Sequence, residues 1–367
     1  MIVCYVCRCL RRNGSDRLVE RIFLFVRFAC LYCMPTDQLD VAVVGVGFIG
    51  ELHTRLYGEH RLTNLQVVVD MDAERAHNVA ESYDVPHVAT DLGEAIKNHD
   101  LDAVTVATPE AHHREPAVTA LERNVSVLLE KPIADTVEDA RAIGDAAEAS
   151  AGKLMVGYCC RFHPQYAALK ARIDDGEIGD VHAITAARIA NREIYDMVAE
   201  WTHPMYYLAV HDIDMMRWYV GADIASVFAA ASGGLDGHET PAVVSATLQF
   251  EDGTVGTLET NWARSDEYPT VRTDEIRLTG TDGYGRLVIE NNGTTLTTDG
   301  GFEMLDANEL HGRETDMYRF ELDHFVDSVL GSETPMVTWE DGLRSLEAAN
   351  AMIDALETGE RVPVGFE

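Results

Sequence analysis

The stretch from Val41 to Gly50, Val-Ala-Val-Val-Gly-Val-Gly-Phe-Ile-Gly, places the strongest constraint on the fold. Its apolar residues show no alternation, which is typical of a strand buried on both faces of a parallel sheet. Gly45, Gly47 and Gly50 follow at the spacing of a dinucleotide-binding turn. They would permit the tight turn, the approach of a pyrophosphate and close packing of the next helix. Taken alone, the pattern also fits a glycine turn without a ligand.

An acidic residue further along the chain strengthens the dinucleotide interpretation. The apolar run Leu65 to Val69 ends in Asp70, twenty positions after Gly50, where such a site places an acid on the ribose hydroxyls. Asp70 would repel a 2′-phosphate, which favours NAD over NADP. The N–H groups at the intervening helix start, at Phe48 and Ile49, would attract phosphates. The alternative is a strand-end aspartate that opens a turn.

Strand-like and helix-like segments alternate over residues 36–157, which predicts an α/β domain with a doubly wound parallel Rossmann sheet. Ligands of such sheets bind beyond the carboxyl ends of the strands. Besides Gly45, the residues expected at that edge are Thr108, Pro109, Glu130 and Lys131. Over residues 158–367, period-two strands joined by tight turns predict an α+β domain with a mainly antiparallel sheet.

The charge of the chain is unusual, with 62 acidic and 29 basic residues and a formal net charge of −33. Such a surface argues against nucleic acid or an anionic membrane as a partner. It repels itself in dilute buffer, whereas the Debye length falls to about 3 Å at 1 M salt. We therefore expect a halophilic, cytoplasmic protein; an acidic protein of ordinary salt tolerance is the alternative.

The segment 1–35 differs from the rest in carrying six arginines and five cysteines. Two Cys-x-x-Cys pairs, which open at Cys4 and Cys30, resemble a zinc site in spacing but contain no glycine or proline for a tight ligand turn. The apolar run at residues 22–34 is too short to cross a bilayer. We interpret 1–35 as a non-native or disordered extension ahead of a start at Met34, with a zinc site and an anchor as alternatives.

Lys131 is the most informative single residue. It is one of four lysines in a chain that prefers arginine, and Pro132 restricts the backbone directly after it. Lysine can pair with a substrate oxygen and can lower its pKa when buried, whereas arginine stays charged. The alternative is a surface lysine in a loop.

Several short motifs together resemble one enzyme family. The motifs are Glu130-Lys131-Pro132, Thr108-Pro109 with His113, the stretch 157–164 with Arg161-Phe162, and His211-Asp212-Ile213-Asp214. Over about residues 38 to 365 the chain is similar to the glucose–fructose oxidoreductase, inositol dehydrogenase and rhizopine-catabolism family, and most similar to its inositol 2-dehydrogenase-like branch. The resemblance implies a nicotinamide cofactor bound by Thr108, Pro109, His113, Glu130, Lys131 and Arg161.

The resemblance also implies catalytic roles. His211 matches the family's catalytic histidine and would take a proton from a secondary hydroxyl, while Lys131 would hold the oxygen. Tyr207 stands where the family commonly has an aspartate, so it would touch the substrate, or the substrate differs from inositol. Without Lys131, a core histidine would be the simpler interpretation of His211. Asp212 and Asp214 could bind a metal with His211, but hydride transfer needs none, and we expect no metal site.

The expected activity is NAD(P)-dependent hydride transfer at a secondary hydroxyl of a sugar or inositol-like cyclic polyol. NAD is favoured over NADP as the cofactor. A non-catalytic dinucleotide-binding regulator and a nicotinamide-dependent glycoside hydrolase are the alternatives, and both occur in the family that the chain resembles. The other expected partner is a second copy of the chain, in a dimer or tetramer, because an uncovered sheet face usually finds a partner.

Overall fold

The computed structural model describes residues 38–199, 202–290, 294–298, 301–305, 309–311 and 313–365. The extension predicted over 1–35 and its two Cys-x-x-Cys pairs lie outside these residues. Across the described ranges, no helix has both the length and the apolar character that a bilayer crossing requires.

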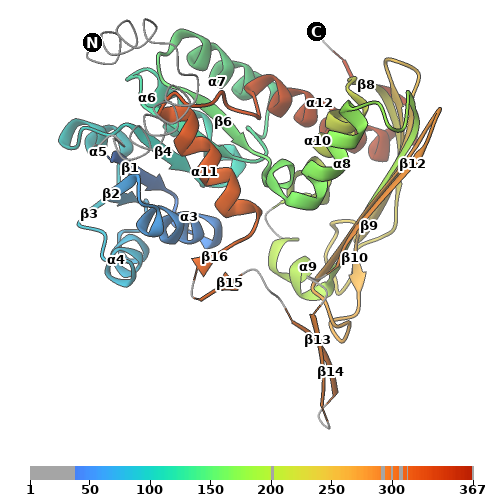
Figure 1. Cartoon of the computed structure of the whole chain (residues 1–367), viewed down its shortest axis with the longest axis horizontal. Coiled ribbons are helices and arrows are strands. Elements are labelled where there is room, and N and C mark those ends of the chain that lie inside the picture. Colours follow the sequence, from blue (N-terminus) through green and yellow to red (C-terminus); the bar gives the residue numbers. More distant parts are fainter. Residues whose placement is uncertain are drawn as a thin grey trace, which may run out of the picture. The chain divides into compact units, whose positions relative to one another are not determined.

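The first sheet is parallel throughout, as predicted, and its strand order is β3-β2-β1-β4-β5-β6 (Figure 1). This is the order of a Rossmann fold, in which the connections reverse direction between β1 and β4. The strands are β1 (Leu39–Val44), β2 (Thr63–Val69), β3 (His87–Ala89), β4 (Ala103–Val106), β5 (Ser126–Glu130) and β6 (Leu154–Gly157).

Helices between these strands begin where side-chain caps are available. Asp91 accepts a hydrogen bond from the N–H of Glu94 at the start of α5, and Asp72 and Thr136 cap their helices in the same way. The helical segments are α3 (Phe48–Glu59), α4 (Ala73–Ser82), α5 (Leu92–Asn98), the 3-10 turn η1 (Glu110–His112), α6 (Arg114–Leu121) and α7 (Val137–Ala149).

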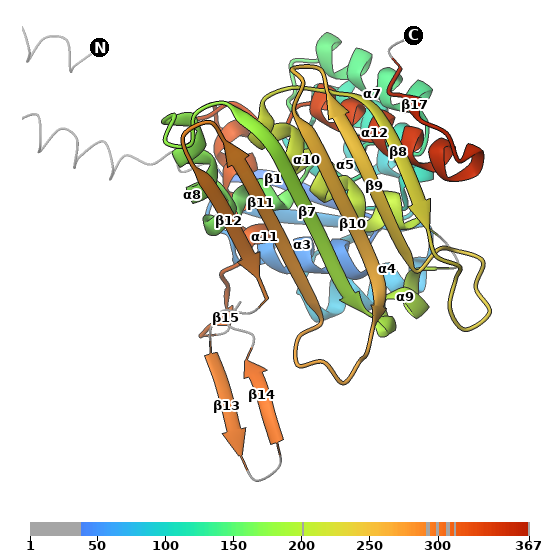
Figure 2. The same ribbon diagram turned by 90° about the vertical axis from the view of Figure 1, so that its right-hand side faces the viewer.

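The second sheet is mixed and mostly antiparallel, in the order β12-β11-β7-β10-β9-β8-β17. Its parallel pair is β7 with β10. The strands are β7 (Val181–Asn191), β8 (Ile224–Ala231), β9 (Val243–Phe250), β10 (Val255–Arg264), β11 (Arg272–Gly280), β12 (Tyr284–Ile289) and β17 (Val362–Pro363). Among the described residues, no helix covers one broad face of this sheet (Figure 2), and the expected homo-oligomer stays a prediction.

The remaining helices lie on the other face of this sheet or join it to the first. α10 contacts β7, while α12 contacts both β8 and β6, and α11 contacts α3. Two short hairpins, β13 (Thr294–Thr298) with β14 (Gly301–Leu305) and β15 (Glu309–Leu310) with β16 (Arg313–Glu314), precede α11. The helical segments are η2 (Cys159–Phe162), α8 (Pro164–Asp174), α9 (Arg192–Val198), the π-helix η3 (Met205–Ala209), α10 (Val210–Val220), α11 (Met317–Val329) and α12 (Trp339–Thr358).

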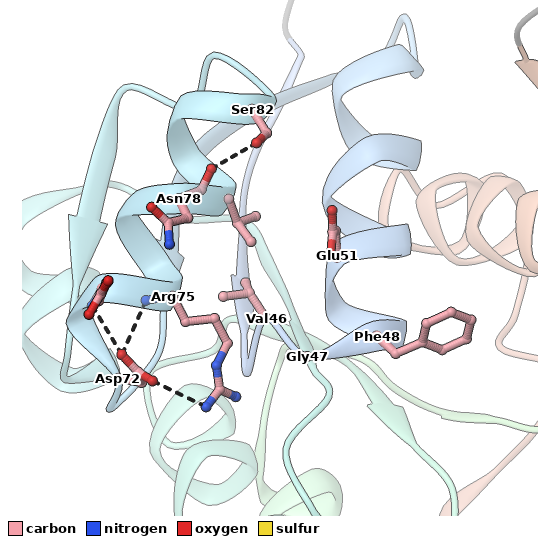
Figure 3. A pocket seen from close by; sticks show the side chains of 10 residues that line it. Val46, Gly47, Phe48, Glu51, Asp72, Arg75, Asn78 and Ser82 are labelled. Atoms are coloured by element: carbon pink, nitrogen blue, oxygen red, sulfur yellow. Dashed lines mark hydrogen bonds and ion pairs between the residues drawn. The ribbon is translucent and has the colours of Figure 1, made fainter. Parts of the chain in front are cut away.

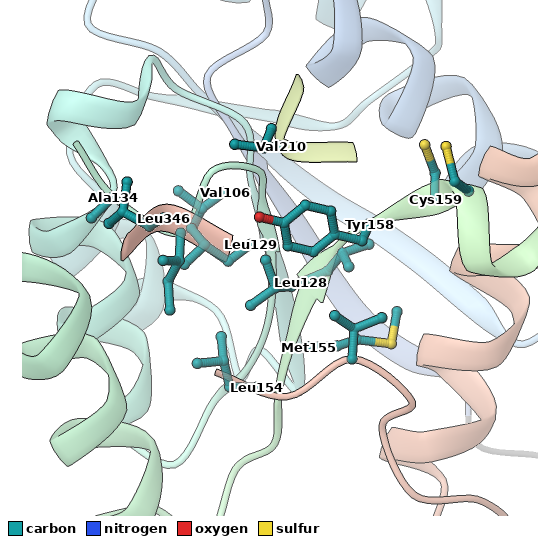
Figure 4. Packing of buried hydrophobic residues seen from close by; sticks show 14 of the residues in the cluster. Val106, Leu128, Leu129, Ala134, Leu154, Met155, Tyr158, Cys159, Val210 and Leu346 are labelled. Atoms are coloured by element: carbon teal, nitrogen blue, oxygen red, sulfur yellow. The ribbon is translucent and has the colours of Figure 1, made fainter. Parts of the chain in front are cut away.

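One hydrophobic core runs from the first sheet to the second. Figure 4 shows side chains from β4, β5 and β6 packed beside Val210 of α10 and Leu346 of α12, with Tyr158 and Cys159 at the end of β6. Since buried apolar area is the main favourable term in folding, this shared core holds η2 and α10 against the carboxyl edge of the parallel sheet.

Candidate active site

The glycine-rich turn after β1 contains two glycines that the fold itself requires. Gly45 has a φ of +80°, and a Cβ there would lie 2.8 Å from the carbonyl oxygen of Ala107. A Cβ on Gly50 would lie 1.8 Å from the carbonyl oxygen of Gly45. Gly47 differs, because a Cβ there would meet no atom within 4 Å. Its open space at the N-terminus of α3 is what a phosphate group needs.

Asp70 joins the end of β2 to this turn. Its Oδ2 accepts a hydrogen bond from the N–H of Val46 over 3.0 Å, and its Oδ1 accepts one from Asp72 over 2.9 Å. Arg75 Nη1 lies 3.6 Å from Asp70 Oδ2. The predicted ribose-binding acid is therefore held beside the glycine-rich turn, with one arginine at its side.

A pocket of about 520 Å³ opens between the first turns of α3 and α4 (Figure 3). Val46 and Gly47 form one wall, and Asp72, Arg75 and Asn78 form the other. Its volume is within the range of about 300–1,000 Å³ that is common for small-molecule sites. Phe48, predicted to bind the cofactor, is 85% exposed and projects away from Arg75, and Ile49 follows it in the first turn of α3.

The loop after β4 is tied to the segment after β5 by a buried histidine. His113 Nε2 lies 2.8 Å from the carbonyl oxygen of Thr108, and its Nδ1 lies 2.9 Å from that of Pro132. Burial lowers the pKa of His113, although these carbonyls and Glu130 oppose the shift. Both ring nitrogens already have backbone partners, so we expect His113 to position Thr108, Pro109 and Lys131 without itself contacting the cofactor.

Lys131 begins at the carboxyl end of β5 and reaches the π-helix η3. Its Nζ donates a hydrogen bond to the carbonyl oxygen of Tyr207 over 3.0 Å and lies 4.9 Å from the centre of the Tyr207 ring. Burial lowers the pKa of Lys131, while the carboxylate of Glu130 raises it. The Oε1 of Glu130 in turn lies 3.5 Å from the Nε2 of His53. The structure therefore brings Lys131 and Tyr207 together.

His211, in the first turn of α10, is buried. Its Nδ1 lies 3.9 Å from the sulfur of Cys160. Its ring packs edge to face against the ring of Tyr158, with the two ring centres 6.2 Å apart. Burial lowers the pKa of His211 well below 6.5, and the positive charges of Lys131 and Arg188 lower it further. The imidazole is therefore neutral near pH 7, the form in which it can accept a proton.

A buried ion-pair network includes Asp212, the residue that follows His211. The guanidinium of Arg188 binds Asp212 through two hydrogen bonds, of 2.9 and 3.0 Å, and binds Asp274 at 3.1 Å. Its Nη2 also lies 3.8 Å from the sulfur of Cys160. Arg188 and Cys160 are the two site residues that sequence reasoning missed. Their signals were an arginine inside an apolar strand and the adjacent cysteines 159 and 160.

Arg161, predicted to bind the cofactor, belongs to a buried ion-pair network. Its guanidinium binds both oxygens of Asp214, at 2.9 and 2.5 Å, and also Asp341 at 3.1 Å. These buried ion pairs hold η2 against α10 and α12, and the contact of Arg161 with the cofactor stays a prediction. Asp214 is thus bound to Arg161, and Asp212 is bound to Arg188.

Comparison with known proteins agrees with this geometry. Residues 39–158 match a family model described as "Oxidoreductase family, NAD-binding Rossmann fold", and residues 166–286 match one described as "GFO/IDH/MocA C-terminal domain". The chain belongs to the GFO/IDH/MocA oxidoreductase family. Family membership confirms the predicted resemblance and makes the chain an NAD-binding oxidoreductase.

Similar GFO/IDH/MocA proteins include inositol dehydrogenases. The scyllo-inositol 2-dehydrogenase (NAD(+)) of Bacillus subtilis is 26% identical over 335 residues, covering 88% of this chain and 95% of the relative. An inositol 2-dehydrogenase of Arthrobacter is 29% identical over 349 residues, which cover 90% of this chain and 97% of the relative. Scyllo-inositol dehydrogenase of Lactobacillus casei, solved with NAD(H) and scyllo-inositol, has a TM-score of 0.80 at 25% identity and covers 89% of this chain and 99% of that one.

Proposed function

We propose that this chain catalyses NAD-dependent oxidation of a secondary hydroxyl on an inositol-like cyclic polyol or a sugar, and the reverse reduction. The observation that carries the proposal is the contact of Lys131, at the carboxyl end of β5, with the backbone of Tyr207. The same helical segment carries His211, whose pKa is lowered by burial and by the charge of Lys131. A half-buried cation and a neutral imidazole on the cofactor side of a Rossmann sheet are the groups that this reaction needs.

The residues around the glycine-rich turn fit a dinucleotide. The pyrophosphate would lie over Gly47, where the protein leaves open space, and the adenosine ribose would lie beside Asp70. The negative charge of Asp70 favours NAD over NADP. Arg75 is close enough to offset part of that charge, so the preference depends mainly on Asp70. When bound, nicotinamide supplies the acceptor for the hydride.

The protein's own contribution is proton transfer and charge stabilisation. Lys131, which Glu130 helps to keep protonated, would hold the substrate oxygen and stabilise its developing negative charge. His211 would take the hydroxyl proton through the ring nitrogen that does not face Cys160. The family's common aspartate is replaced by Tyr207, and Cys160 is the group found at Nδ1 of His211. The thiol would thus help to orient the imidazole.

The identity of the substrate is inferred from the relatives. Those named above are inositol dehydrogenases at 25–29% identity, which supports a cyclic polyol as the substrate class. Tyr207 replaces a carboxylate near the reacting carbon, so hydroxyl recognition differs from that of family members with aspartate. We therefore include aldoses beside inositols as candidate substrates.

The test is an assay of the full chain with NAD or NADP and a panel of inositols and aldoses. It is run with and without molar KCl, because a chain with a net charge of −33 repels itself at low salt. We expect NADH formation with at least one cyclic polyol or sugar, and a higher rate with NAD than with NADP.

Two other results would each point to a different activity. Normal NAD binding without NADH formation from any substrate would favour a dinucleotide-binding regulator. Release of a cleaved sugar from a glycoside without net NADH would favour a nicotinamide-dependent glycoside hydrolase. Following product sugars by chromatography alongside absorbance separates these two results.

A further inference from the structure

Two adjacent cysteines and the candidate catalytic histidine form a compact group of metal-binding atoms. Cys159 and Cys160 begin the 3-10 turn η2, and His211 lies in the first turn of α10. The two sulfurs and a ring nitrogen of His211 all lie within 4.8 Å of one another. All three side chains are buried, so their positions are set by packing and not by solvent. The fold therefore presents two thiols and one imidazole toward a common point.

The spacing of these atoms is close to that of a tetrahedral zinc site. With Zn–S distances of about 2.3 Å and Zn–N distances of about 2.0 Å, sulfur and nitrogen ligands are about 3.6 Å apart. The observed distance between the Cys160 sulfur and His211 Nδ1 is 3.9 Å. Small side-chain rotations would close this difference. Three protein ligands would leave the fourth position for water.

The surroundings favour a thiolate at Cys160 but not at Cys159. The hydrogen bond between the two thiols and burial raise the pKa of Cys159, as do the carboxylates of Glu321 and Glu130, whereas the same hydrogen bond and Arg188 lower the pKa of Cys160. Arg188 Nη2 lies 3.8 Å from the sulfur of Cys160, and a neighbouring cation stabilises a thiolate. The charge of Arg188 is itself balanced by Asp212 and Asp274, so it does not simply repel a metal ion. On binding, both thiols would release their protons, and two thiolates would neutralise a divalent cation.

We propose that Cys159, Cys160 and His211 bind a thiophilic divalent cation, Zn²⁺ or Cd²⁺, and that binding inhibits the enzyme. Soft thiolate ligands with an imidazole select such cations over Mg²⁺ or Ca²⁺. A neutral imidazole has a single free lone pair. Once Nδ1 gives it to the cation, the other nitrogen carries the ring proton and cannot accept the proton of a substrate hydroxyl. The inhibition, although not the binding, rests on the proposed function of His211.

The experiment uses the full chain with serine at the five cysteines of the N-terminal segment, because those cysteines could bind zinc themselves. They are Cys4, Cys7, Cys9, Cys30 and Cys33. In this background, Co²⁺ serves as a spectroscopic probe, since cobalt bound to thiolates absorbs in the near ultraviolet. Bound zinc per chain is measured after dialysis, and NADH formation is measured with Zn²⁺, Cd²⁺ or Mg²⁺ added.

We expect one Zn²⁺ per chain, a thiolate–cobalt band, and inhibition by Zn²⁺ and Cd²⁺ but not by Mg²⁺. Cys159→Ser should retain activity, lose the band and require about tenfold or more Zn²⁺ for inhibition, because one of three ligands is gone. Cys159→Ala serves as a second variant, and thermal unfolding of both confirms that they fold.

Failure of the proposal and failure of the proposed function give different results. The proposal is overturned if the background protein binds no Zn²⁺ or Co²⁺, if Cys159→Ser binds them unchanged, or if Mg²⁺ inhibits equally. If the cobalt band depends on Cys159 while no substrate is oxidised, the metal site stands and the dehydrogenase assignment fails. Protection by NADH together with a polyol would further support the site, because substrate at His211 would block entry of the cation.

Discussion

The Nζ of Lys131 donates a hydrogen bond to the backbone carbonyl of Tyr207 over a distance of 3.0 Å. The lysine follows the fifth strand of the parallel sheet, and the tyrosine lies in the π-helix that leads into α10. The two residues are 76 positions apart in the sequence. This contact places the candidate catalytic cation against the segment that carries the candidate base.

Lys131→Met should abolish most of the activity without unfolding the protein. The substitution removes the cation that would stabilise the substrate oxygen, so we expect kcat/KM to fall by about a hundredfold or more. Binding of NAD, measured by calorimetry, should change little, because the glycine-rich turn is unaffected. Lys97→Met, on the exposed side of α5, is the matched control and should leave activity intact. Equal activity in both variants would contradict the assigned role.

Gly47→Ala should weaken NAD binding while preserving stability. A Cβ at Gly47 meets no protein atom, and its φ of −73° suits alanine. The methyl group would instead occupy the space of the pyrophosphate, so we expect Kd for NAD to rise about tenfold or more. Gly50→Ala is the contrasting variant: its Cβ would overlap Gly45 and should lower the melting temperature. Unchanged NAD affinity in Gly47→Ala would show that the phosphates bind elsewhere.

Asp70→Ser should shift the cofactor preference toward NADP. The substitution removes the negative charge that opposes a 2′-phosphate. It also removes the carboxylate beside Arg75 Nη1, although Arg75 Nη2 still lies 3.4 Å from Asp72. We expect the ratio of kcat/KM for NAD to that for NADP to fall about tenfold or more. Glu74→Gln is the control, because it removes one negative charge from the same pocket and leaves both Asp70 and Asp72 beside Arg75. A similar shift in that control would mean that overall charge, not Asp70, sets the preference.

The pH dependence of oxidation should have its acid limb below pH 6.5. The base must be neutral, and burial with nearby positive charges lowers the pKa of His211 from 6.5. Activity should therefore persist as pH falls through 6.5 and be lost only at the lower pKa. We would measure kcat/KM against pH in metal-free buffer. An acid limb at or above pH 6.5 would contradict a buried, neutral His211 as the base.

Asp214→Asn should destabilise the protein without changing its affinity for NAD. Arg161 is 4% and Asp214 0% exposed, so the substitution leaves a buried guanidinium partly unpaired. We expect the free energy of unfolding to fall by about 3–5 kcal/mol. The double variant Arg161→Met with Asp214→Leu removes both charges and should recover much of that loss. A weaker NAD complex in the folded single variant would support the predicted contact of Arg161 with the cofactor.

Much of the fold was predictable because its strands and turns have strong local signals. Apolar runs without alternation correctly predicted the central strands of the first sheet, and period-two runs correctly predicted five of the six strands from β7 to β12. β8 was missed because alanine, which has a low strand propensity, forms half of it. The π-helix η3 directly before α10 was also missed, since its apolar pattern equally fits an α-helix.

The sequence by itself determined the glycine-rich turn and the Rossmann sheet, and it marked Lys131 as a candidate site residue. These features depend on neighbouring residues: glycine at set spacings, a strand before them and a helix after them. The contacts of Arg161, His113 and Cys160 were decided only by the tertiary structure. Each depends on a partner more than ten residues away, or on two backbone carbonyls, and local patterns carry no information about such contacts.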